Sequence, residues 1–402
     1  MPSDAKQRIT YVLGSFPSGI QSFVFNELKE LSKLGFNINV FSVYGRPQSN
    51  NDDLNWTSKT LYAEPLCSIK IIFSHLYFML TKPGTYFPLL REYRSFRGKG
   101  VFLRSAYFAR QAVKRNIKHI HAHFAWTATD AARLISKLSN ITYSLTAHQS
   151  DINRCADDNL YEKLEEARFI FTCTNGNREY LGKKYGKDIY DKTAAIYHGV
   201  DLQTFRPEAS REVQDVDILA IGSLIRVKGL DYLIRACGFL KSRGLRLKCV
   251  IVGNGPEKEY LEYLISELNL RDLVEIKEPV PYSKVHELYN KARIFVLPAV
   301  VIDGAPHGIP NVLAEAMAMG LPVISSNVPD ISELIEHGRN GILVREKDPE
   351  ALAWAIEGLL KDENKRDYLS AMAREKIESE FDATKHIRRI SDIFLRAACR
   401  ES

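Results

Sequence analysis

The sequence predicts an α/β fold with two domains, each built on a parallel β-sheet, and three observations lead to this prediction. The chain has 402 residues, which is too long for one ordinary core and indicates two domains of roughly 200 residues each. Short β-branched runs alternate with segments of helical periodicity, as in successive βαβ units. Because 45% of the residues are hydrophobic, the chain can fill both cores.

Twelve short apolar runs are the expected strands. Those in the first half of the chain begin at residues 8, 37, 119, 142, 169 and 194. Those in the second half begin at residues 216, 246, 273, 292, 321 and 341. The similarity of the two sets predicts two Rossmann-like domains, joined near the polar segment 205–215. We therefore expect domains at 1–205 and 206–380, and a C-terminal helix at 381–402 that returns to the first domain.

The cysteines and the N-terminus predict a cellular compartment. Six scattered cysteines lack the spacing of a metal or redox motif, so we interpret them as reduced thiols of a cytosolic protein. The first residues, MPSDAKQRITYVLG, lack the charged-then-apolar layout of a signal peptide. No apolar run reaches the roughly 18 residues that a membrane span needs. These features predict a cytoplasmic protein that is soluble or peripheral to a membrane.

Positive charge is concentrated between residues 66 and 115. This segment contains ten Lys or Arg against one acid, Glu92, so its net charge is +9, whereas the whole chain carries +6. Aromatic side chains are interleaved with the basic ones, a composition that suits an anionic membrane surface. A solvated basic face above ordinary core aromatics is the alternative. Nucleic acid is disfavoured as a partner because no compact basic recognition motif accompanies the segment.

The segment 303–326 has the pattern of an anion site at a helix start. It reads DGAPHGIPNVLAEAMAMGLPVISS, in which Pro310 fits the first helical position and Gly320 the C-terminal stop. Backbone N–H groups at the helix start would point into the loop, with the positive end of the helix dipole behind them. These groups belong to Gly308, Ile309, Asn311 and Val312. His307 and Glu315 flank them, so both are expected to face the anion.

Two further loops of the second half follow expected strands. In GSLIRVKG, Gly222 allows a tight turn, and Arg226 and Lys228 place cations at a helix start, which suits a diphosphate. A surface turn with ordinary basic residues is the alternative. The second loop, GNGP, begins at Gly253. Because Lys258 stands where a dinucleotide fingerprint needs its third glycine, nicotinamide binding is disfavoured.

The first half contains three candidate features. Gly14 opens the loop GSFPSG after the first strand and allows a ligand to approach closely. His121 and His123 share one face of a strand, but without a nearby carboxylate or third ligand a metal site is disfavoured. His148 falls just past a strand, with Asp151 three residues later. It suits either a hydrogen bond to a sugar or phosphate oxygen or a purely structural role.

The motifs together resemble a known family. In order and spacing, GSLIRVKG, IVGNGP, PHGIPNVLAEAMAMGLPVISS and ELIEHGRNGILV resemble the C-terminal domain of the retaining glycosyltransferases of family four, which have the GT-B fold. In the first half, SFPSGIQSFVFNEL, HAHF, TAHQSDI and HGVDLQTFRP resemble segments of the same family. The likeness covers nearly the whole chain and looks most like enzymes of capsule, exopolysaccharide or lipopolysaccharide assembly. It implies an acceptor domain and a nucleotide-sugar domain that face each other across a cleft.

The resemblance implies roles for the matching residues. Lys228 matches the lysine that contacts the donor diphosphate, and Glu315 matches the glutamate that binds the nucleotide ribose. The backbone amides from Ile309 to Leu313 match the phosphate-binding helix start. His148 matches the histidine beside the transferred sugar, and Val280 lies in the segment that lines the base.

The resemblance also implies a reaction without metal or other cofactor. Asp215 and Asp217 form a D-x-D pattern, which holds a divalent metal in some nucleotide-sugar enzymes. The pattern lies at the amino end of its expected strand, the wrong edge of the sheet for a ligand. We therefore interpret it as solvated turn charge and expect no metal ligands.

Three positions depart from the family pattern. Ser223 stands where arginine is common, so one diphosphate cation is missing unless Arg226 replaces it. His307 stands where a glutamate is usual, and neutral histidine offers one donor and one acceptor instead of two acceptors. Either the choice of donor or the strength of catalysis is expected to change. Glu278 replaces a frequent glycine, which leaves base recognition open.

The leading expectation is a retaining hexosyltransferase that uses a nucleotide diphosphate sugar, with UDP favoured and GDP possible, and a lipid-linked or oligosaccharide acceptor. The alternatives are a nucleotide-sugar epimerase of the same fold and a catalytically weak nucleotide-sugar-binding partner subunit. The residues expected in catalysis are His148, Lys228, Arg226 and His307. Those expected to bind the donor are Gly14, Gly222, Ser223, Lys228, Gly253, Val280, Gly308, Ile309, Asn311, Val312, Leu313 and Glu315.

Overall fold

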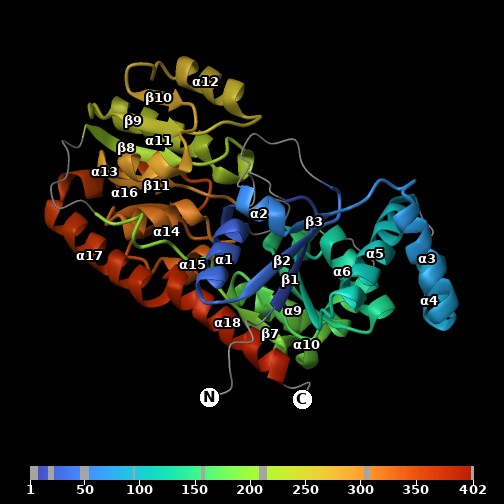
Figure 1. Ribbon diagram of the computed structural model, residues 1–402. Coiled ribbons are helices and arrows are strands. Elements are labelled where there is room, and N and C mark those ends of the chain that lie inside the picture. Colours follow the sequence, from blue (N-terminus) through green and yellow to red (C-terminus); the bar gives the residue numbers. More distant parts are fainter. Residues whose placement is uncertain are drawn as a thin grey trace. The chain divides into compact units, whose positions relative to one another are not determined.

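The computed structural model describes residues 8–16, 22–45, 54–93, 96–154, 159–207, 215–302 and 308–399. The chain divides into two compact units. The N-terminal unit combines Met1–Cys173, Asn177–Ile196 and Ile387–Ser402, and the C-terminal unit combines Thr174–Gly176 and Tyr197–His386. Each unit contains one parallel sheet covered by helices, which confirms the predicted α/β fold (Figure 1).

The sheet of the N-terminal unit has seven parallel strands in the order β3-β2-β1-β4-β5-β6-β7. The strands are β1 (Arg8–Leu13), β2 (Asn37–Ser42), β3 (Thr60–Tyr62), β4 (His119–His123), β5 (Thr142–Ala147), β6 (Ile170–Thr172) and β7 (Thr193–Ala195). The strand order reverses between β1 and β4, and Val12 of β1 lies opposite both Phe41 of β2 and Ala122 of β4. Such a switch point leaves room for a ligand beyond the carboxyl ends of the strands.

The sheet of the C-terminal unit has six parallel strands in the order β10-β9-β8-β11-β12-β13. They are β8 (Val216–Ile221), β9 (Cys249–Val252), β10 (Val274–Lys277), β11 (Ala292–Leu297), β12 (Val323–Ser326) and β13 (Ile342–Val344). The switch point of this sheet lies between β8 and β11, where Leu219 pairs with Phe295. Both strands are buried, as expected for the centre of a parallel sheet.

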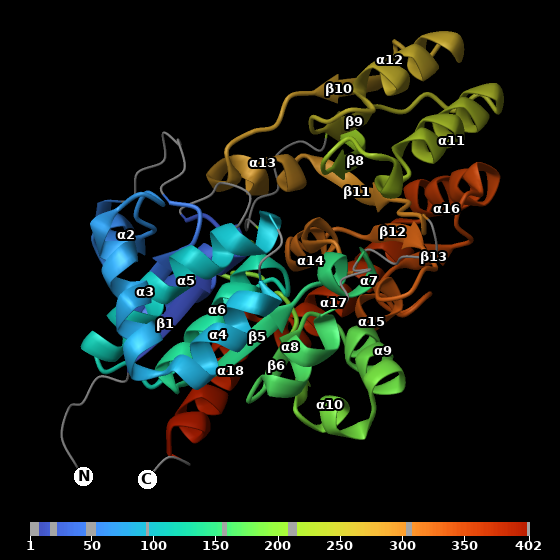
Figure 2. The same ribbon diagram turned by 90° about the vertical axis from the view of Figure 1, so that its right-hand side faces the viewer.

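Helices connect the strands in both units (Figure 2). The N-terminal unit contains α1 (Ser22–Lys33), α2 (Leu54–Lys59), α3 (Ile69–Thr81), α4 (Pro83–Glu92), α5 (Phe96–Lys114), α6 (Thr127–Ser139), α7 (Gln149–Arg154), α8 (Leu160–Glu166), α9 (Asn175–Tyr185) from its third residue onward, and α10 (Lys187–Asp191). The C-terminal unit contains η1 (Arg226–Lys228), α11 (Leu230–Ser242), α12 (Lys258–Glu267), η2 (Tyr282–Lys284), α13 (Val285–Asn290), α14 (Asn311–Ala318), α15 (Ile331–Leu334), α16 (Pro349–Lys361) and α17 (Glu363–Glu380). The last helix is α18 (Ala383–Cys399).

All twelve expected strands are present, and β3 is an additional strand that the sequence did not predict. It has three residues, TLY, all partly exposed. Because β3 lies at the edge of the sheet and follows α2 directly, it lacks the buried β-branched run that marks the other strands. An apolar pattern cannot reveal so short an edge strand.

The boundaries between the units differ from the expected ones. The chain enters the C-terminal unit at Tyr197 rather than after residue 205, because Val200 and Phe205 are buried in the core of that unit. The backbone of Val200 also bonds the chain at the start of α18: its N–H donates to the carbonyl of Phe381 at 2.8 Å, and its carbonyl accepts from the N–H of Ala383 at 3.1 Å. The chain returns to the N-terminal unit at Ile387 rather than at residue 381.

The C-terminal part of α18 belongs to the N-terminal unit. Phe394 is buried, and its ring centroid lies 6.3 Å from that of Tyr11 on β1 and 5.8 Å from that of Phe171 on β6. The side chain of Arg389 donates a hydrogen bond of 3.0 Å to the carbonyl of Ala195, at the end of β7. Residues from opposite ends of the chain thus complete one core. Among the described residues, no helix has both the length and the apolar character needed to cross a membrane.

Candidate active site

The predicted donor-binding residues of the C-terminal unit lie in loops that follow four neighbouring strands. Gly222 to Lys228 follow β8, Gly253 follows β9, Val280 comes after β10, and the segment that leads into α14 comes after β11. Because these strands are parallel, all four loops emerge at the same edge of the sheet. The structure therefore brings together residues that are up to about 90 positions apart in the sequence.

Close backbone packing holds the loops after β8, β9 and β11 together. A side chain at Gly253 would overlap the carbonyl oxygen of Gly222, and one at Gly229 would overlap the carbonyl oxygen of Pro298. Gly229 also has a φ of +64°, which L-residues with a side chain rarely adopt. The N–H of Gly222 donates to the carbonyl of Val252 at 3.0 Å. Glycine is thus required here for loop–loop contact.

Lys228 ends the short helix η1 and is half-buried. Its Cε atom lies next to Gly222, 3.9 Å from the position that a side-chain carbon would occupy there. Burial lowers the pKa of the Lys228 ammonium. No hydrogen bond or ion pair is formed by its ammonium within the described part of the chain. A poorly hydrated cation in this position favours binding of an anion.

Arg226 lines a pocket that Lys228 does not line. It lines a pocket of about 550 Å³ with Asp231, Tyr232, Glu257, Tyr260, Val300, Val301, Ile302 and Lys347. Neither Lys228 nor Glu315 lines this pocket. The guanidinium of Arg226 is exposed and shares the pocket with two carboxylates. The expectation that Arg226 replaces the cation missing at Ser223, which is itself exposed, stays a prediction.

Glu315 lies on α14 with only 6% of its surface exposed. Its Oε2 accepts a hydrogen bond of 3.0 Å from the hydroxyl of Tyr289, and its Oε1 accepts one of 3.3 Å from the hydroxyl of Tyr282. Burial raises the pKa of Glu315, and the two tyrosine hydrogen bonds oppose this rise. An ionised carboxylate can accept about four hydrogen bonds, so this group retains acceptor capacity for the hydroxyls of a ligand.

The sequence did not reveal the two tyrosines. Tyr282 lies in η2 and Tyr289 on α13, which follow a different strand from the one that precedes α14. They are 33 and 26 residues from Glu315. No spacing rule links positions so far apart, and only the packing of α13 against the sheet brings their hydroxyls to the carboxylate.

The start of α14 offers fewer backbone donors than expected. The helix begins at Asn311, so Pro310 is the residue before the helix rather than its first residue. The N–H of Leu313 donates to the carbonyl of Pro310 at 3.0 Å, so Leu313 is not a donor to a ligand. Gly320, with a φ of +67°, does end the helical segment as predicted. The donors that have no partner among the described residues are the N–H groups of Ile309, Asn311 and Val312.

A carboxylate occupies one side of this loop. The backbone N–H of Gly308 donates to the side chain of Asp330, so Gly308 is also not a donor to a ligand. Burial raises the pKa of Asp330, which reduces the negative charge that it places beside the loop. His307, a predicted catalytic residue, lies outside the described residues.

Glu278, which departs from the family pattern, connects the chain after β10 to the chain after β9. Glu278 forms an ion pair with Lys258 and accepts a hydrogen bond of 3.2 Å from the side chain of Asn254. Lys258 thus links the two loops at the position where a dinucleotide-binding protein would have its third glycine. The side chain of Val280 packs against the core of the unit, so its backbone is the part that can face a base.

In the N-terminal unit, His148 is buried directly after β5. Its backbone N–H donates to Oδ2 of Asp151 at 2.9 Å, and the N–H of Ala125 donates to the same oxygen at 2.9 Å. Burial raises the pKa of Asp151 to about 6. The ring of Phe124 lies 4.4 Å from that of His148, centroid to centroid. Asp151 therefore positions the backbone of His148 and does not contact its ring nitrogens.

The expectation that no carboxylate lies near His121 and His123 was wrong. Glu27 of α1 is close to both, and single ligand atoms of the three residues lie within 4.8 Å of one another. Both ring nitrogens of His121 contact hydroxyls, those of Ser144 at 2.7 Å and Thr146 at 2.9 Å. Burial lowers the pKa of His121 well below its usual value, which keeps the ring neutral. The donor set is suitable for a metal, but these nitrogens already have hydrogen-bond partners.

The remaining predicted features are placed as follows. Gly14 lies directly after β1, and a side chain there would make only ordinary contact with Tyr44, so the protein itself does not require glycine. The rest of that loop, residues 17–19, lies outside the described residues. Asp215 and Asp217 lie at the amino end of β8, as expected, and pair with Lys248 at 3.2 Å and Arg293 at 2.9 Å.

The chain has two units, each built on a parallel sheet. Lys228 and Glu315 lie beyond the strands of one unit, and the buried His148 follows a strand of the other. This is the architecture of GT-B glycosyltransferases. The chain belongs to glycosyltransferase family 4. A family model described as Glycosyltransferase Family 4 matches residues 17–204, and one described as Glycosyl transferases group 1 matches residues 202–376.

Named relatives agree with this family, and a solved structure shares the fold. The chain is 25% identical to the putative colanic acid biosynthesis glycosyltransferase WcaL of Escherichia coli, over 93% of this chain and 96% of the relative. It is 27% identical to the amylovoran biosynthesis glycosyltransferase AmsK of Erwinia amylovora, over 97% of this chain and 100% of AmsK. The structure of HepE of Anabaena in complex with UDP matches with a TM-score of 0.73 at 15% identity, over 97% of this chain and 100% of HepE.

Proposed function

We propose that this protein transfers a hexosyl group from a nucleotide diphosphate sugar to a lipid-linked or oligosaccharide acceptor, with retained anomeric configuration. The observation that carries the proposal is that the buried Glu315 carboxylate and the half-buried Lys228 ammonium both lie beyond the same edge of the sheet. The first suits ribose hydroxyls and the second a diphosphate. The names of the relatives WcaL and AmsK support a role in bacterial surface polysaccharide biosynthesis.

The proposed chemistry needs charge stabilisation more than it needs a nucleophile. As the bond between sugar and diphosphate breaks, negative charge grows on the leaving phosphate, which then accepts the proton of the attacking hydroxyl on the same face. Lys228 and the N–H groups of Ile309, Asn311 and Val312 would stabilise that charge. In this proposal no metal ion takes part. His307 is proposed to contact the transferred sugar, as is His148.

The base of the donor can be tested without knowing the acceptor. We propose UDP as the preferred nucleotide, with GDP second, and the UDP complex of HepE supports this choice. A thermal-shift panel of UDP, GDP and ADP tests it, because a ligand at 100 times its Kd stabilises by about 2.7 kcal/mol. UDP is expected to give the largest shift. A larger shift with ADP or GDP would make that nucleotide the preferred one instead of UDP. The absence of a shift with every nucleotide would contradict the donor site.

Transfer itself is tested with radiolabelled UDP-hexoses and a bacterial membrane fraction as the source of acceptors. Labelled product in the lipid or oligosaccharide fraction, with the anomeric configuration of the donor, is the expected result. An inverted configuration would contradict the mechanism. Release of a free sugar or an epimer without acceptor would instead indicate an epimerase.

A second candidate function is a partner subunit that binds nucleotide sugar but catalyses weakly. The contact between Asp330 and the N–H of Gly308 favours it, because this contact removes one donor and places a carboxylate at the anion loop. Asp330→Asn should strengthen UDP binding in either case, since the carboxylate no longer opposes a phosphate. Tight UDP binding with no transfer to any membrane acceptor would favour the partner subunit.

We further propose that the N-terminal unit binds an anionic membrane surface at the inner face of the cell membrane through α3 and α4. One face of α3 packs on the unit through Ile71, Ser74, His75 and Phe78. The opposite face is also apolar. Ile69 is 65% exposed and Leu80 82% exposed, and other exposed apolar residues of the two helices are Ile72, Phe73, Leu76, Met79, Phe87 and Leu90. A helix that is apolar on both faces is expected to have a partner on each.

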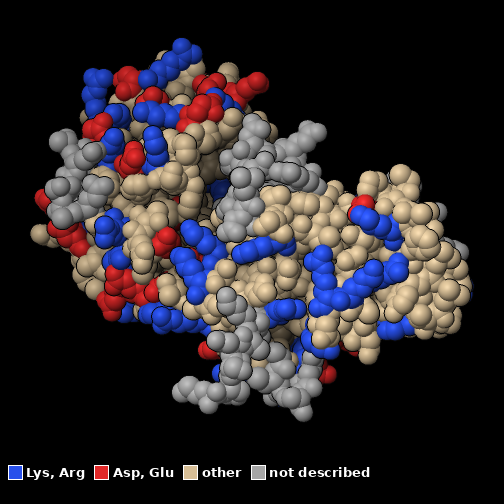
Figure 3. All heavy atoms as spheres, viewed as in Figure 1, with Lys and Arg blue, Asp and Glu red and all other residues tan. Residues whose placement is uncertain are grey.

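Charge favours a lipid partner for this outer face. Figure 3 shows Lys and Arg side chains gathered over this part of the N-terminal unit, beside a broad uncharged surface. The described basic residues of the segment are Lys70, Lys82, Arg91, Arg104, Arg110, Lys114 and Arg115. Arg94 lies outside the described residues, as do the side chains of Arg97 and Lys99. Apolar insertion flanked by cations is typical of peripheral binding to anionic lipid, at about 1 kcal/mol per cation.

Vesicle flotation tests the membrane proposal. The protein is expected to float with phosphatidylglycerol vesicles and much less with phosphatidylcholine vesicles, and Leu80→Asp should abolish flotation. Tyr263→Asp, at a 63% exposed site on α12, is the matched control and should float normally. Equal flotation of the Leu80 variant would overturn the proposal. Concentration-dependent dimerisation that Leu80→Asp abolishes, without flotation, would show that a second copy covers the face.

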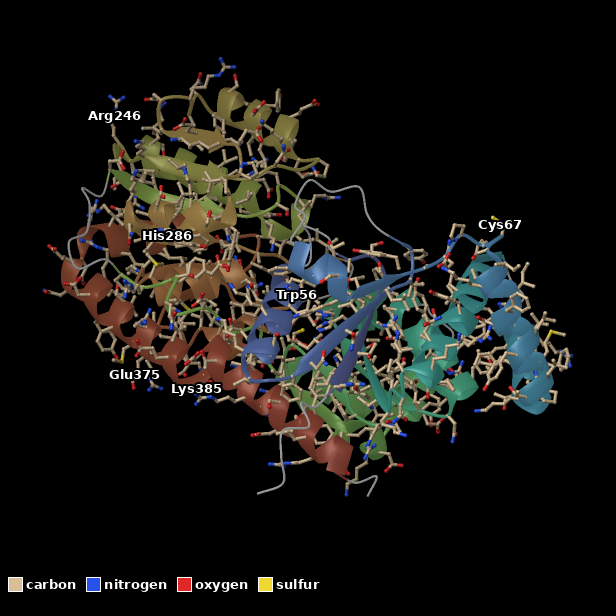
Figure 4. All side chains as sticks on the ribbon, in the orientation of Figure 1. Trp56, Cys67, Arg246, His286, Glu375 and Lys385 are labelled. Carbon is tan, nitrogen blue, oxygen red and sulfur yellow. The ribbon has the colours of Figure 1, made fainter. Side chains whose placement is uncertain are left out.

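A label reports the same contact directly. Cys67 is exposed and lies at the beginning of the segment, directly before α3 (Figure 4). An environment-sensitive fluorophore on Cys67 is expected to shift to the blue when anionic vesicles are added, and Cys67→Ser gives the background of the other thiols. A label that does not respond while the protein floats would place the membrane contact elsewhere.

A further inference from the structure

A line of hydrogen-bonded side chains reaches the buried His148 from the interior of the N-terminal unit. Tyr11 of β1 donates its hydroxyl hydrogen to Oε1 of Glu27 at 2.6 Å. The same oxygen lies 3.2 Å from Nε2 of His123, whose Nδ1 lies 3.3 Å from Nε2 of His148. On its other side, Nδ1 of His148 lies 3.4 Å from the sulfur of Cys173. The contacts join β1, α1 and β4 to the loops after β5 and β6.

The chemistry of the groups assigns the hydrogen positions. An ionised carboxylate only accepts hydrogen bonds, so Glu27 requires the hydrogen of His123 on Nε2. The Nδ1 atom of neutral His123 is then an acceptor and requires the hydrogen of His148 on Nε2. Tyr11 remains a donor because burial, followed by the charge of Glu27, raises its pKa well above the usual value. Nδ1 of His148 is left as an acceptor, which the weak S–H donor of Cys173 faces.

We infer that Glu27 and His123 are positioning residues that hold His148 in the tautomer with hydrogen on Nε2, so that Nδ1 accepts a hydrogen bond from a sugar hydroxyl. The inference rests on the proposed function, in which His148 lies beside the transferred sugar. A hydroxyl is a stronger donor than a thiol and would take the place of the Cys173 contact. With its tautomer fixed, Nδ1 of His148 can only accept a hydrogen bond from the sugar hydroxyl and cannot donate one.

A metal ion is the competing use of these side chains, since Glu27, His121 and His123 could ligate one. It would have to displace the Thr146 hydroxyl, 2.9 Å from Nε2 of His121, and break the contact between Glu27 and His123. The hydrogen-bonded arrangement satisfies the same atoms without that loss. It is therefore the arrangement that the geometry favours.

The tautomer can be measured by nitrogen NMR of protein labelled with ¹⁵N-histidine, because protonated and bare ring nitrogens have separate shifts. The spectrum contains signals from ten histidines, and those of His148 are identified by their loss in His148→Gln. Wild-type His148 should carry hydrogen on Nε2. In Glu27→Gln the amide can donate to Nε2 of His123, so the hydrogens of both rings should move partly or fully to Nδ1.

Turnover is the second readout. Glu27→Gln is expected to lower transfer turnover about 10-fold or more, as for loss of a hydrogen bond to a charged or polarised group, with the donor KM nearly unchanged. Glu27→Asp, which keeps the carboxylate, should restore part of the turnover. His119→Gln is the control. His119 lies on the same strand as His123, but its ring contacts Thr142 and Ser144 and does not belong to the line of hydrogen-bonded side chains.

A further variant keeps the inference testable if Glu27→Gln does not fold. His123→Asn places a carbonyl oxygen near the former Nδ1, so it should preserve the His148 tautomer, whereas His123→Leu should not. Hydrogen on Nδ1 in the wild type, or an unchanged tautomer and turnover in Glu27→Gln, would overturn the inference. Stoichiometric bound zinc that Glu27→Gln releases would overturn it in favour of the metal. The NMR result stands apart from activity, so absence of transfer would contradict only the proposed function.

Discussion

Lys228 and Glu315 are charged side chains that the C-terminal unit keeps partly or largely out of water. Glu315 has two tyrosine hydroxyls as donors, whereas Lys228 has no partner within the described part of the chain. Loss of hydration without a compensating partner is unfavourable, and a bound diphosphate would remove that penalty. In the proposed function the two residues bind opposite parts of one ligand.

Lys228→Ala should lower turnover about 100-fold or more, because in the proposed function it removes a cation that stabilises the leaving phosphate. The measurement is the initial transfer rate at saturating donor. Lys248→Ala, at the amino edge of the sheet, is the matched control and should retain the wild-type rate. Full activity of the Lys228 variant would show that the leaving group is stabilised elsewhere.

Tyr289→Phe tests the support of Glu315. Without this hydroxyl the pKa of the carboxyl should rise further, because one hydrogen bond to its charged form is lost. UDP affinity near pH 7 is expected to fall by about 3- to 10-fold, and it should weaken at a higher pH than in the wild type as pH is lowered. Calorimetric titration at several pH values measures both effects. Tyr263→Phe should behave as the wild type. An equal response of both variants would show that the Tyr289 hydroxyl does not contribute to UDP binding.

Asp151 predicts a pH dependence of stability. Burial raises its pKa from 3.8 to about 6, so between these values the folded protein binds more protons than the unfolded chain, and stability falls as pH rises. Asparagine can accept the same backbone hydrogen bonds without ionising. Asp151→Asn should therefore gain stability relative to the wild type between about pH 4 and 6 and keep that difference above pH 6. Denaturant unfolding across this range checks the sign, and a pH-independent difference would contradict it.

At the scale of elements, turns and helix starts decide which backbone groups can bind a ligand. The pattern at 308–315 predicted a helix and its anion site, yet the N–H groups of Gly308 and Leu313 are bound within the protein. The loop after β8 contacts the end of β11 only because Gly229 has no side chain. Element ends therefore differ from idealised ones by single hydrogen bonds that sequence patterns do not resolve.

Gly229→Ala should destabilise the C-terminal unit by about 2 kcal/mol or more. It adds the strain of a positive φ to an overlap with the carbonyl of Pro298. Gly244→Ala is the control: its φ is +79° and nothing lies within 4 Å of the new carbon, so only about 1 kcal/mol is expected. Equal losses in chemical denaturation would mean that the contact with Pro298 relaxes freely.

At the scale of the whole molecule, the chain leaves the N-terminal unit, builds the C-terminal unit and returns in α18. The returning part contributes Ile387, Ile390 and Phe394 to the core that contains Tyr11. The N-terminal unit therefore depends on residues that follow the C-terminal unit in the chain. Its core cannot be complete until the C-terminal unit has been made.

Phe394→Ala should lower the stability of the N-terminal unit by about 3–5 kcal/mol, the usual loss for a buried phenylalanine. Leu395→Ala, at a neighbouring site that is 40% exposed, should change it by less than about 0.5 kcal/mol. Denaturation followed by hydrogen exchange of β1 and β6 assigns the change to the unit. Loss of protection only in the C-terminal strands would contradict this role of α18.

Strand positions and the two-domain plan followed from the sequence because they depend on local rules: apolar periodicity, glycine and proline at turns, and the order of βαβ units. The start of α14 was placed one residue too early. The same rules brought attention to Lys228 and His148 in the chain that follows a strand, and to Glu315 on the helix that follows another strand. They could not reveal β3, a three-residue edge strand, or the early boundary at Tyr197.

The tertiary structure alone decided which side chains meet. Tyr289 donates a hydrogen bond to Glu315, 26 residues away in the sequence, and Glu27 contacts His123, 96 residues away. Such pairs depend on which strands are neighbours and on how helices pack against them, and neither is encoded by spacing along the chain. The sequence therefore determined the kind of protein and the loops of its site, whereas the partners that tune each functional group were set by packing.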